Sequence, residues 1–259
     1  MNALNKNLLL LLFVVFYVIG ELFKLLLMIF SYYNFSEWIS FVVSTILMIL
    51  LLLFYSKKVD SKNIFYLNSK QMIFLLKSIL LLLCLYVIYF PVFYILIDPT
   101  HLAVDNIFFL SWNSSNNLLN DNQQILFFYF KAICLAPILE EVLFRGLLQK
   151  YLYKTKLPFI AILISTLLFS LSHYDVNKIF ITFVPGLLFG FVYYKSGSLI
   201  IPILCHSAWN ILCHIFPETN QPISIFPILI FVLSTVGFVL LFRNLWKTDM
   251  SELNNEKIS

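Results

Sequence analysis

Long apolar runs dominate this sequence. About eight of them approach or reach the ~20 residues that an α-helix needs to cross the hydrocarbon core of a bilayer, since each residue adds about 1.5 Å. Hydrophobic residues make up 61% of the 259 residues and charged residues only 12%, whereas about a quarter of a typical soluble domain is charged. The expected spans are Leu8 to Phe30, Trp38 to Tyr55, Met72 to Ile97, Ile125 to Tyr151, Pro158 to His173, Ile179 to Tyr194, Leu199 to Ile215 and Ile223 to Phe242. The sequence therefore predicts an all-α, polytopic membrane protein in which residues 1–259 form a single transmembrane domain.

The connections between these spans alternate in charge, and Lys and Arg accumulate on the cytoplasmic side of membrane proteins. The basic residues fall at the two ends and in alternate connections: Lys6; Lys57, Lys58, Lys62 and Lys70; Lys150, Lys154 and Lys156; Lys195; Arg243 and Lys247. We therefore expect both termini to be cytoplasmic and the long connection of residues 99–124 to lie outside. The first run has no small-residue cleavage site, so it is expected to remain as the first span.

The net charge of +4 does not indicate a nucleic-acid partner, because the basic residues are scattered beside the spans and not gathered on one face. The lipid bilayer is the expected partner, and no oligomeric state is predicted. The four cysteines lie in apolar runs without a CxxC pair, which indicates helix packing and neither disulfides nor structural zinc. They are Cys84, Cys134, Cys205 and Cys213.

The stretch APILEEVLFRG at residues 136–146 places two glutamates and an arginine in an apolar span. Ionisable residues at membrane depth are costly and usually mark a site. Glu141 and Arg145 are four residues apart and share a helix face, so they are expected to pair. Glu140 points about 100° away, towards the apolar neighbour Phe144, and is left as a candidate general base. Pro137, one turn earlier, is expected to kink and locally open this helix.

Two later spans carry histidines. Phe169 and His173 are four residues apart in the fifth span, and the seventh span places His206, Asn210 and His214 on one face. With Glu140, these groups supply a carboxylate, imidazoles and a carboxamide, which can activate water and stabilise an oxyanion. The charge-derived topology, however, puts Glu140 and His206 near mid-membrane and His173 toward the outer end of its span.

Other hydrolytic chemistries fit less well. The sequence has no GxSxG motif and no aspartate within a span to complete a serine triad. Cys205 adjoins His206, but neighbours on a helix diverge by about 100° and cannot share a proton directly. The sequence also lacks the HExxH motif that is typical of a zinc protease. Three separate helices could still bring Glu140, His173 and His206 together as metal ligands, so a metal is not excluded.

The ordered set EEVLFR, FSLSH and HSAWN closely resembles the EExxxR, FxxxH and HxxxN motifs of the CAAX prenyl protease and bacteriocin-processing family, also called Abi or CPBP intramembrane proteases. The resemblance covers about residues 128–214, within an expected catalytic core of about 125–215. It implies that Glu140 activates the hydrolytic water with help from His173. It also implies that His206 and Asn210 stabilise the oxyanion, while Glu141, Arg145 and Phe169 are supporting residues.

The expected function is therefore that of an intramembrane glutamic endopeptidase without a cofactor. Its expected substrate is a membrane-associated peptide or lipidated protein, of the prenylated, pheromone or bacteriocin type. The compact chain resembles the prokaryotic members, so a multi-pass protein of a prokaryotic cell membrane is expected. Three alternatives remain: a catalytically idle immunity or scaffold protein, a zinc-dependent intramembrane protease, and a proton-coupled transporter, although the inverted repeats typical of many transporters are not evident.

Overall fold

The computed structural model describes residues 67–97, 129–153, 156–173, 176–215 and 225–248. Within these ranges every element is a helix and no strand occurs. The helices are α3 (Ser69–Ile97), η2 (Lys131–Leu135), α6 (Ala136–Glu141), η3 (Val142–Gln149), α7 (Lys150–Leu152), α8 (Pro158–Leu171), α9 (Val176–Ser196), α10 (Ile200–Ile215) and α11 (Ile225–Lys247). The predicted all-helical class is thus confirmed for the described part of the chain.

The helices of the described ranges follow the predicted spans three to eight closely. Three of them are long and apolar enough to cross a membrane, over Ser69–Tyr89, Lys178–Ser196 and Leu229–Lys247, while Pro158–Leu171 and Ile200–Cys213 are shorter apolar helices. The first two predicted spans, the connection of residues 99–124 and both termini lie outside the described residues. The count of eight spans and the orientation of the termini therefore stay predictions.

The predicted fourth span is not one uniform α-helix. It consists of two π-helical segments, η2 and η3, separated by α6 and followed by the short α7. The first π-helical segment closes with a bond from the backbone N–H of Ala136 to the carbonyl of Lys131, directly before Pro137, which has no N–H to donate. The sequence predicted a disturbance of the helix at Pro137, and the α-helical hydrogen bonding is interrupted at this point. Helical π-segments are rare and often occur at functional sites.

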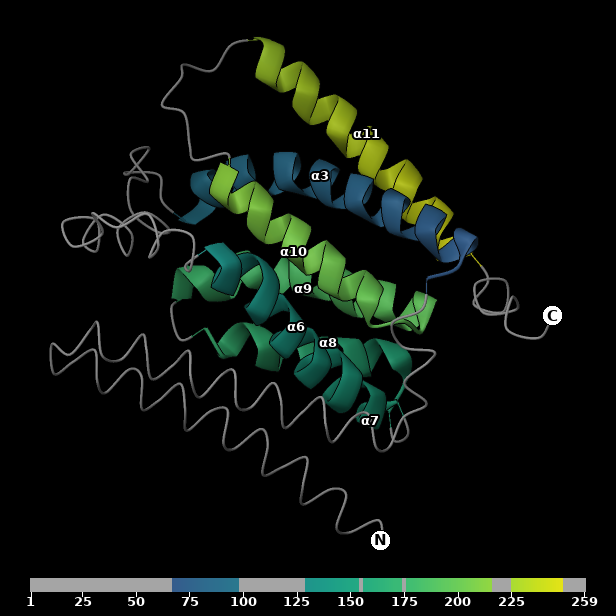
Figure 1. Ribbon diagram of the computed structural model, residues 1–259. Helices are drawn as coiled ribbons and strands as arrows, with labels where there is room; N and C mark the ends of the chain where they lie inside the picture. The colour runs from purple at the N-terminus through teal and green to yellow at the C-terminus, as the bar shows by residue number, and fades with distance from the viewer. Residues whose placement is uncertain (1–66, 98–128, 154–155, 174–175, 216–224, 249–259) are drawn as a thin grey trace, which may run out of the picture.

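Helix α9 lies at the centre of the described helices, in contact with α3, α8, α10 and η3. Helix α3 packs against α9 and α10 on one side and α11 on the other, so α11 forms the outer edge of the bundle (Figure 1). The composite helix around α6 and η3 packs against α8, α9 and α10. This arrangement brings the segments that carry the three sequence motifs, on α6–η3, α8 and α10, to one side of the bundle.

Apolar side chains both fill the bundle and cover its outer surface. The largest buried cluster joins α3, α9 and α10 and includes Leu81, Phe189 and Trp209. Large apolar side chains are also exposed along α3, α8 and α11, and the membrane-crossing window of α11 is only 6% buried. Such extended exposed apolar surfaces are typical of a protein that faces lipid.

Candidate active site

Glu141 lies at the centre of a buried polar network. Its Oε1 accepts a hydrogen bond from Nη1 of Arg145 at 3.1 Å and lies 2.9 Å from Nδ1 of His206. Both members of the ion pair are fully buried, with side-chain exposures of 0%. The pairing of Glu141 with Arg145 predicted from their spacing is confirmed. The bond from Glu141 to His206 was not predicted, because it joins two helices whose relative rotation the sequence does not specify.

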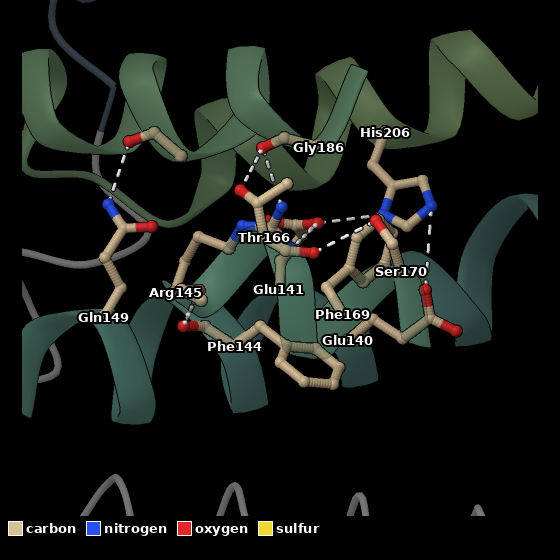
Figure 2. A network of polar contacts seen from close by, with 12 residues as sticks. Glu140, Glu141, Phe144, Arg145, Gln149, Thr166, Phe169, Ser170, Gly186 and His206 are labelled. Carbon is tan, nitrogen blue, oxygen red and sulfur yellow. Dashed lines mark hydrogen bonds and ion pairs between the residues drawn. The ribbon is translucent and has the colours of Figure 1, made fainter. Parts of the chain in front are cut away.

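Glu140 lies on the opposite side of the same imidazole (Figure 2). Its Oε2 is 3.7 Å from Nε2 of His206, which is longer than a direct hydrogen bond. The side chain of Glu140 is 14% exposed, whereas that of Glu141 has no exposed surface. The two adjacent carboxylates therefore differ in accessibility, and only Glu140 presents surface that a small molecule can reach.

The contacts of His206 define its hydrogen-bonding pattern. Glu141 forms a fully buried ion pair with Arg145 and is therefore a carboxylate, which can only accept hydrogen bonds. Nδ1 of His206 is therefore the donor to Glu141, and Nε2 is directed towards Glu140. The ring stacks on Phe189 with centroids 4.8 Å apart. The histidine is thus fixed both in the plane of its ring and at one nitrogen.

Phe169 connects the second motif to the network. Its ring meets His173 and His206 edge to face, with centroids 5.1 and 5.5 Å apart, and the guanidinium of Arg145 lies over it at 4.6 Å. Nδ1 of His173 lies 3.0 Å from the carbonyl oxygen of Phe169, just beyond the end of α8. The two histidines are therefore gathered around one aromatic ring, although the charge-derived topology placed them at different depths.

The short length of α8 explains how they meet. Its 14 residues span about 21 Å at ~1.5 Å per residue, less than the ~30 Å thickness of the hydrocarbon core. If α8 begins at one interface, its other end lies within the membrane and not at the opposite surface. A short α8 that ends within the membrane would account for the contact of His173 with residues that the charge-derived topology placed near mid-membrane.

The remaining residues of the third motif lie on α10. The amide Nδ2 of Asn210 donates a hydrogen bond to the carbonyl oxygen of Ala132 in η2 at 2.8 Å, and its side chain is partly exposed. This bond ties the third motif to the first π-helical segment. His214 also belongs to α10, but its side chain lies outside the described part of the structure.

Two side chains that the three motifs do not contain, Thr166 and Gln149, join Arg145 in holding this site to its neighbours. Arg145 Nη2 and Thr166 Oγ1 both donate to the carbonyl oxygen of Gly186, at 2.9 and 3.1 Å. Gln149 Nε2 donates to the carbonyl oxygen of Gly190 at 2.9 Å. The GLLFG stretch that contains both acceptors was a usable signal, because GxxxG in an apolar helix marks close helix packing.

Metal ligation is a separate question. Among the residues that the structure describes, no group of three or more His, Cys, Asp or Glu side chains is arranged to hold a metal ion. The convergence of Glu140, His173 and His206 on one metal, considered from the sequence, thus has no geometric support in this part of the chain.

Comparisons with known proteins identify the family that the site resembles. Residues 122–212 match the family described as Type II CAAX prenyl endopeptidase Rce1-like. A Bacillus subtilis (strain 168) protein named "Putative membrane peptidase YdiL" is 33% identical over 75 residues, which cover 29% of this chain and 31% of that relative. No solved structure matches the chain. The resemblance inferred from the three motifs is confirmed over the segment that contains them, and the matched family is one of endopeptidases.

Proposed function

We propose that this chain, whose residues 122–212 match a family of CAAX prenyl endopeptidases, is an intramembrane endopeptidase. It hydrolyses a peptide bond of a membrane-associated substrate with a water molecule activated by Glu140. The matched segment covers about a third of the chain. The match alone therefore does not assign an activity to the whole protein, and the activity stated here is a proposal. The apolar surfaces of α3, α8 and α11 support a reaction within the bilayer.

The observation that carries the proposal is the unequal use of the two glutamates. Glu141 is fully buried, and its Oε1 is engaged by both Arg145 and His206. Glu140 faces the other nitrogen of the same imidazole and keeps an exposed fraction. A general base must reach the proton that it removes, and of the two carboxylates only Glu140 is accessible for this role.

The proposed reaction needs only groups already present. Glu140 takes a proton from water while the water oxygen attacks the carbonyl carbon of the substrate. When the tetrahedral intermediate collapses, the C–N bond breaks and Glu140 returns the proton to the leaving nitrogen. His173, whose side chain is partly exposed beside Phe169, assists in positioning the water.

His206 and Asn210 are proposed to stabilise the oxyanion. Since Nδ1 of His206 donates to Glu141, its Nε2 can donate to an oxyanion only when the ring is doubly protonated. Glu141 on the opposite nitrogen stabilises that positive charge, as the carboxylate of a catalytic triad does. With a doubly protonated His206, the charges of Arg145 and His206 balance those of Glu140 and Glu141.

The test is cleavage by the purified protein in lipid vesicles or detergent, using fluorogenic peptides in matched prenylated and unprenylated forms. The proposal expects cleavage that is insensitive to a metal chelator and absent in Glu140→Gln. Loss of activity with chelator would contradict water activation by Glu140 alone and would indicate a metal-dependent mechanism. If the natural activity of the protein in cells survived Glu140→Gln, an immunity or scaffold role would replace the peptidase. A difference between the two peptide forms would decide whether the lipid is recognised.

A further inference from the structure

Gln149 is a fully buried polar side chain one turn beyond Arg145 on the π-helical segment η3. Its Nε2 donates to the carbonyl oxygen of Gly190 at 2.9 Å and also to the hydroxyl of Tyr153. Burying an amide is costly unless it is hydrogen-bonded. Its hydrogen bonds go to Tyr153 and Gly190 and not to the glutamates or histidines described above, so the proposed mechanism does not explain its presence.

The bond of Gln149 repeats that of Arg145 in register. Arg145 and Gln149 are four residues apart on η3, and their acceptors, Gly186 and Gly190, are four residues apart on α9. Both donor–acceptor distances are 2.9 Å. Sliding η3 by one residue along α9 would break both bonds at once, so the pair of bonds specifies a single register.

The register matters because η3 continues directly from the helix that carries the glutamates (Figure 2). A π-helical segment has hydrogen bonds from residue i to residue i+5 and is less regular than an α-helix. The direction of Glu140 and Glu141 thus depends on how this segment is held against α9. Arg145 binds both Glu141 and Gly186 and so transmits that constraint to the carboxylate.

Glycine at position 190 is what allows the approach. A Cβ atom built there would lie 3.0 Å from Oε1 of Gln149 and 2.9 Å from Cγ2 of Ile162. The second of these contacts is closer than real Cβ atoms come to a neighbour, so either Ile162 or the helix must shift. A residue larger than glycine would therefore crowd Ile162 on α8 and the amide of Gln149 on η3, at the point where that amide bonds to α9.

We propose that Gln149 is a positioning residue of the site: by its bond to Gly190 it fixes the register of η3 on α9, and through Arg145 it sets the geometry of Glu141 and His206. This inference rests on the proposed peptidase function. It adds a residue outside the three motifs to the set on which turnover depends.

The experiment compares kcat and KM of the purified full-length protein with those of Gln149→Met, which keeps a side chain of similar length without the amide donors. Gly190→Ala crowds the same bond from its other side and also crowds Ile162 on α8. The matched controls are Tyr153→Phe, which removes only the second partner of Gln149, and Gly237→Ala, where the new Cβ would meet just Cys84 Sγ at 3.3 Å. Rates are expressed per folded molecule, below the unfolding temperature of each variant.

We expect kcat of Gln149→Met and Gly190→Ala to fall about tenfold or more with little change in KM, because small displacements of catalytic groups are costly. The double variant should lose little more than either single variant, since both act on one bond. The kcat of each control variant should stay within about twofold of the wild-type value, because the groups that they change do not act together with the bond from Gln149 to Gly190. Where Gln149→Met does not fold, Gly190→Ala alone carries the test.

Two results would overturn the inference separately. The first is an unchanged kcat per folded molecule in Gln149→Met or, where that variant does not fold, in Gly190→Ala; Gln149 would then have only a structural role. The proposed function would still stand in that case if the wild type cleaved the peptide and Glu140→Gln did not. If the wild-type protein cleaved none of the peptides, both the function and this inference would fail.

Discussion

At the scale of residues, adjacent positions on one helix have different chemical surroundings. Neighbouring side chains point about 100° apart, so Glu141 is directed to Arg145 and Nδ1 of His206, while Glu140 is directed to Nε2. The spacing of the arginine was enough to predict which glutamate it serves. Contacts of His206 with both carboxylates could not be predicted, because they depend on how α10 crosses α6.

Replacing Glu141 by Gln should destabilise the protein. The change leaves the fully buried Arg145 without its carboxylate, and breaking a buried ion pair costs about 3–5 kcal/mol. Thermal unfolding in detergent should show a clear decrease in the unfolding temperature. Glu140→Gln is the control at the adjacent, partly exposed position, and it should unfold close to the wild type. Equal unfolding temperatures of wild type and Glu141→Gln would contradict the assignment of Glu141 to the buried pair.

Phe169→Leu should reduce both turnover and stability. Leucine keeps most of the apolar burial, but it removes the ring that contacts His173 and His206 and lies under Arg145. The lost cation–π and aromatic contacts are worth about 1–2 kcal/mol each at most. Peptide cleavage should fall about tenfold, the rate equivalent of about 1.4 kcal/mol. Leu167→Ala, at a side chain that is 46% exposed on the same helix, should cleave normally. If both variants behaved alike, Phe169 would have no part in the site.

At the scale of elements, the π-helical segments and the glycines of α9 hold the site together. The carbonyl oxygen of Gly186 receives bonds from Arg145 on η3 and from Thr166 on α8, so three elements meet at one backbone atom. Hydropathy located the span but gave no sign of its π-helical bonding, because apolar periodicity does not distinguish helix types in an almost uniformly apolar segment. Pro137 indicated the interruption, and the GLLFG stretch was a signal of close packing that the prediction from sequence did not use.

Gly186→Ala should destabilise this junction. The added Cβ would lie 3.0 Å from Cγ2 of Thr166 and 3.1 Å from Cδ1 of Phe169, and forcing an extra carbon into a packed interior costs about 1–3 kcal/mol. The cost exceeds the gain of up to about 1 kcal/mol that alanine brings to a helix. A lower unfolding temperature is expected, together with reduced cleavage. Gly237→Ala, with one contact at 3.3 Å, should change stability by less than about 1 kcal/mol. Stabilisation by Gly186→Ala would show that the junction is loose.

At the scale of the whole molecule, run length and hydropathy predicted the described helices well. The predicted span of Met72 to Ile97 corresponds to α3 (Ser69–Ile97), and that of Leu199 to Ile215 to α10 (Ile200–Ile215). The last helix extends to Lys247, beyond the predicted end at Phe242. Lengths are predictable because the bilayer imposes them. Lateral packing is not, since apolar faces of similar composition do not specify which helices meet.

The orientation in the membrane is a prediction at this scale. Alternating charge places residues 56–70 inside and residues 99–124 outside; residues 56–66 and the whole second segment lie beyond the described residues. In a cysteine-free variant, a single cysteine at Ser115 should react with a membrane-impermeant thiol reagent in intact cells. A single cysteine at Ser61 should react only after the membrane is opened. The reverse pattern would invert the predicted topology.

The most direct test of the account is kcat of Glu140→Gln on a peptide that the wild type cleaves. General-base catalysis contributes about 10²–10⁴-fold to a rate, so kcat should fall by at least about a hundredfold. The unfolding temperature should stay close to that of the wild type, because Glu140 is not the glutamate bonded to Arg145. A folded Glu140→Gln protein that cleaves the peptide at the wild-type rate would contradict the central claim that Glu140 activates the hydrolytic water.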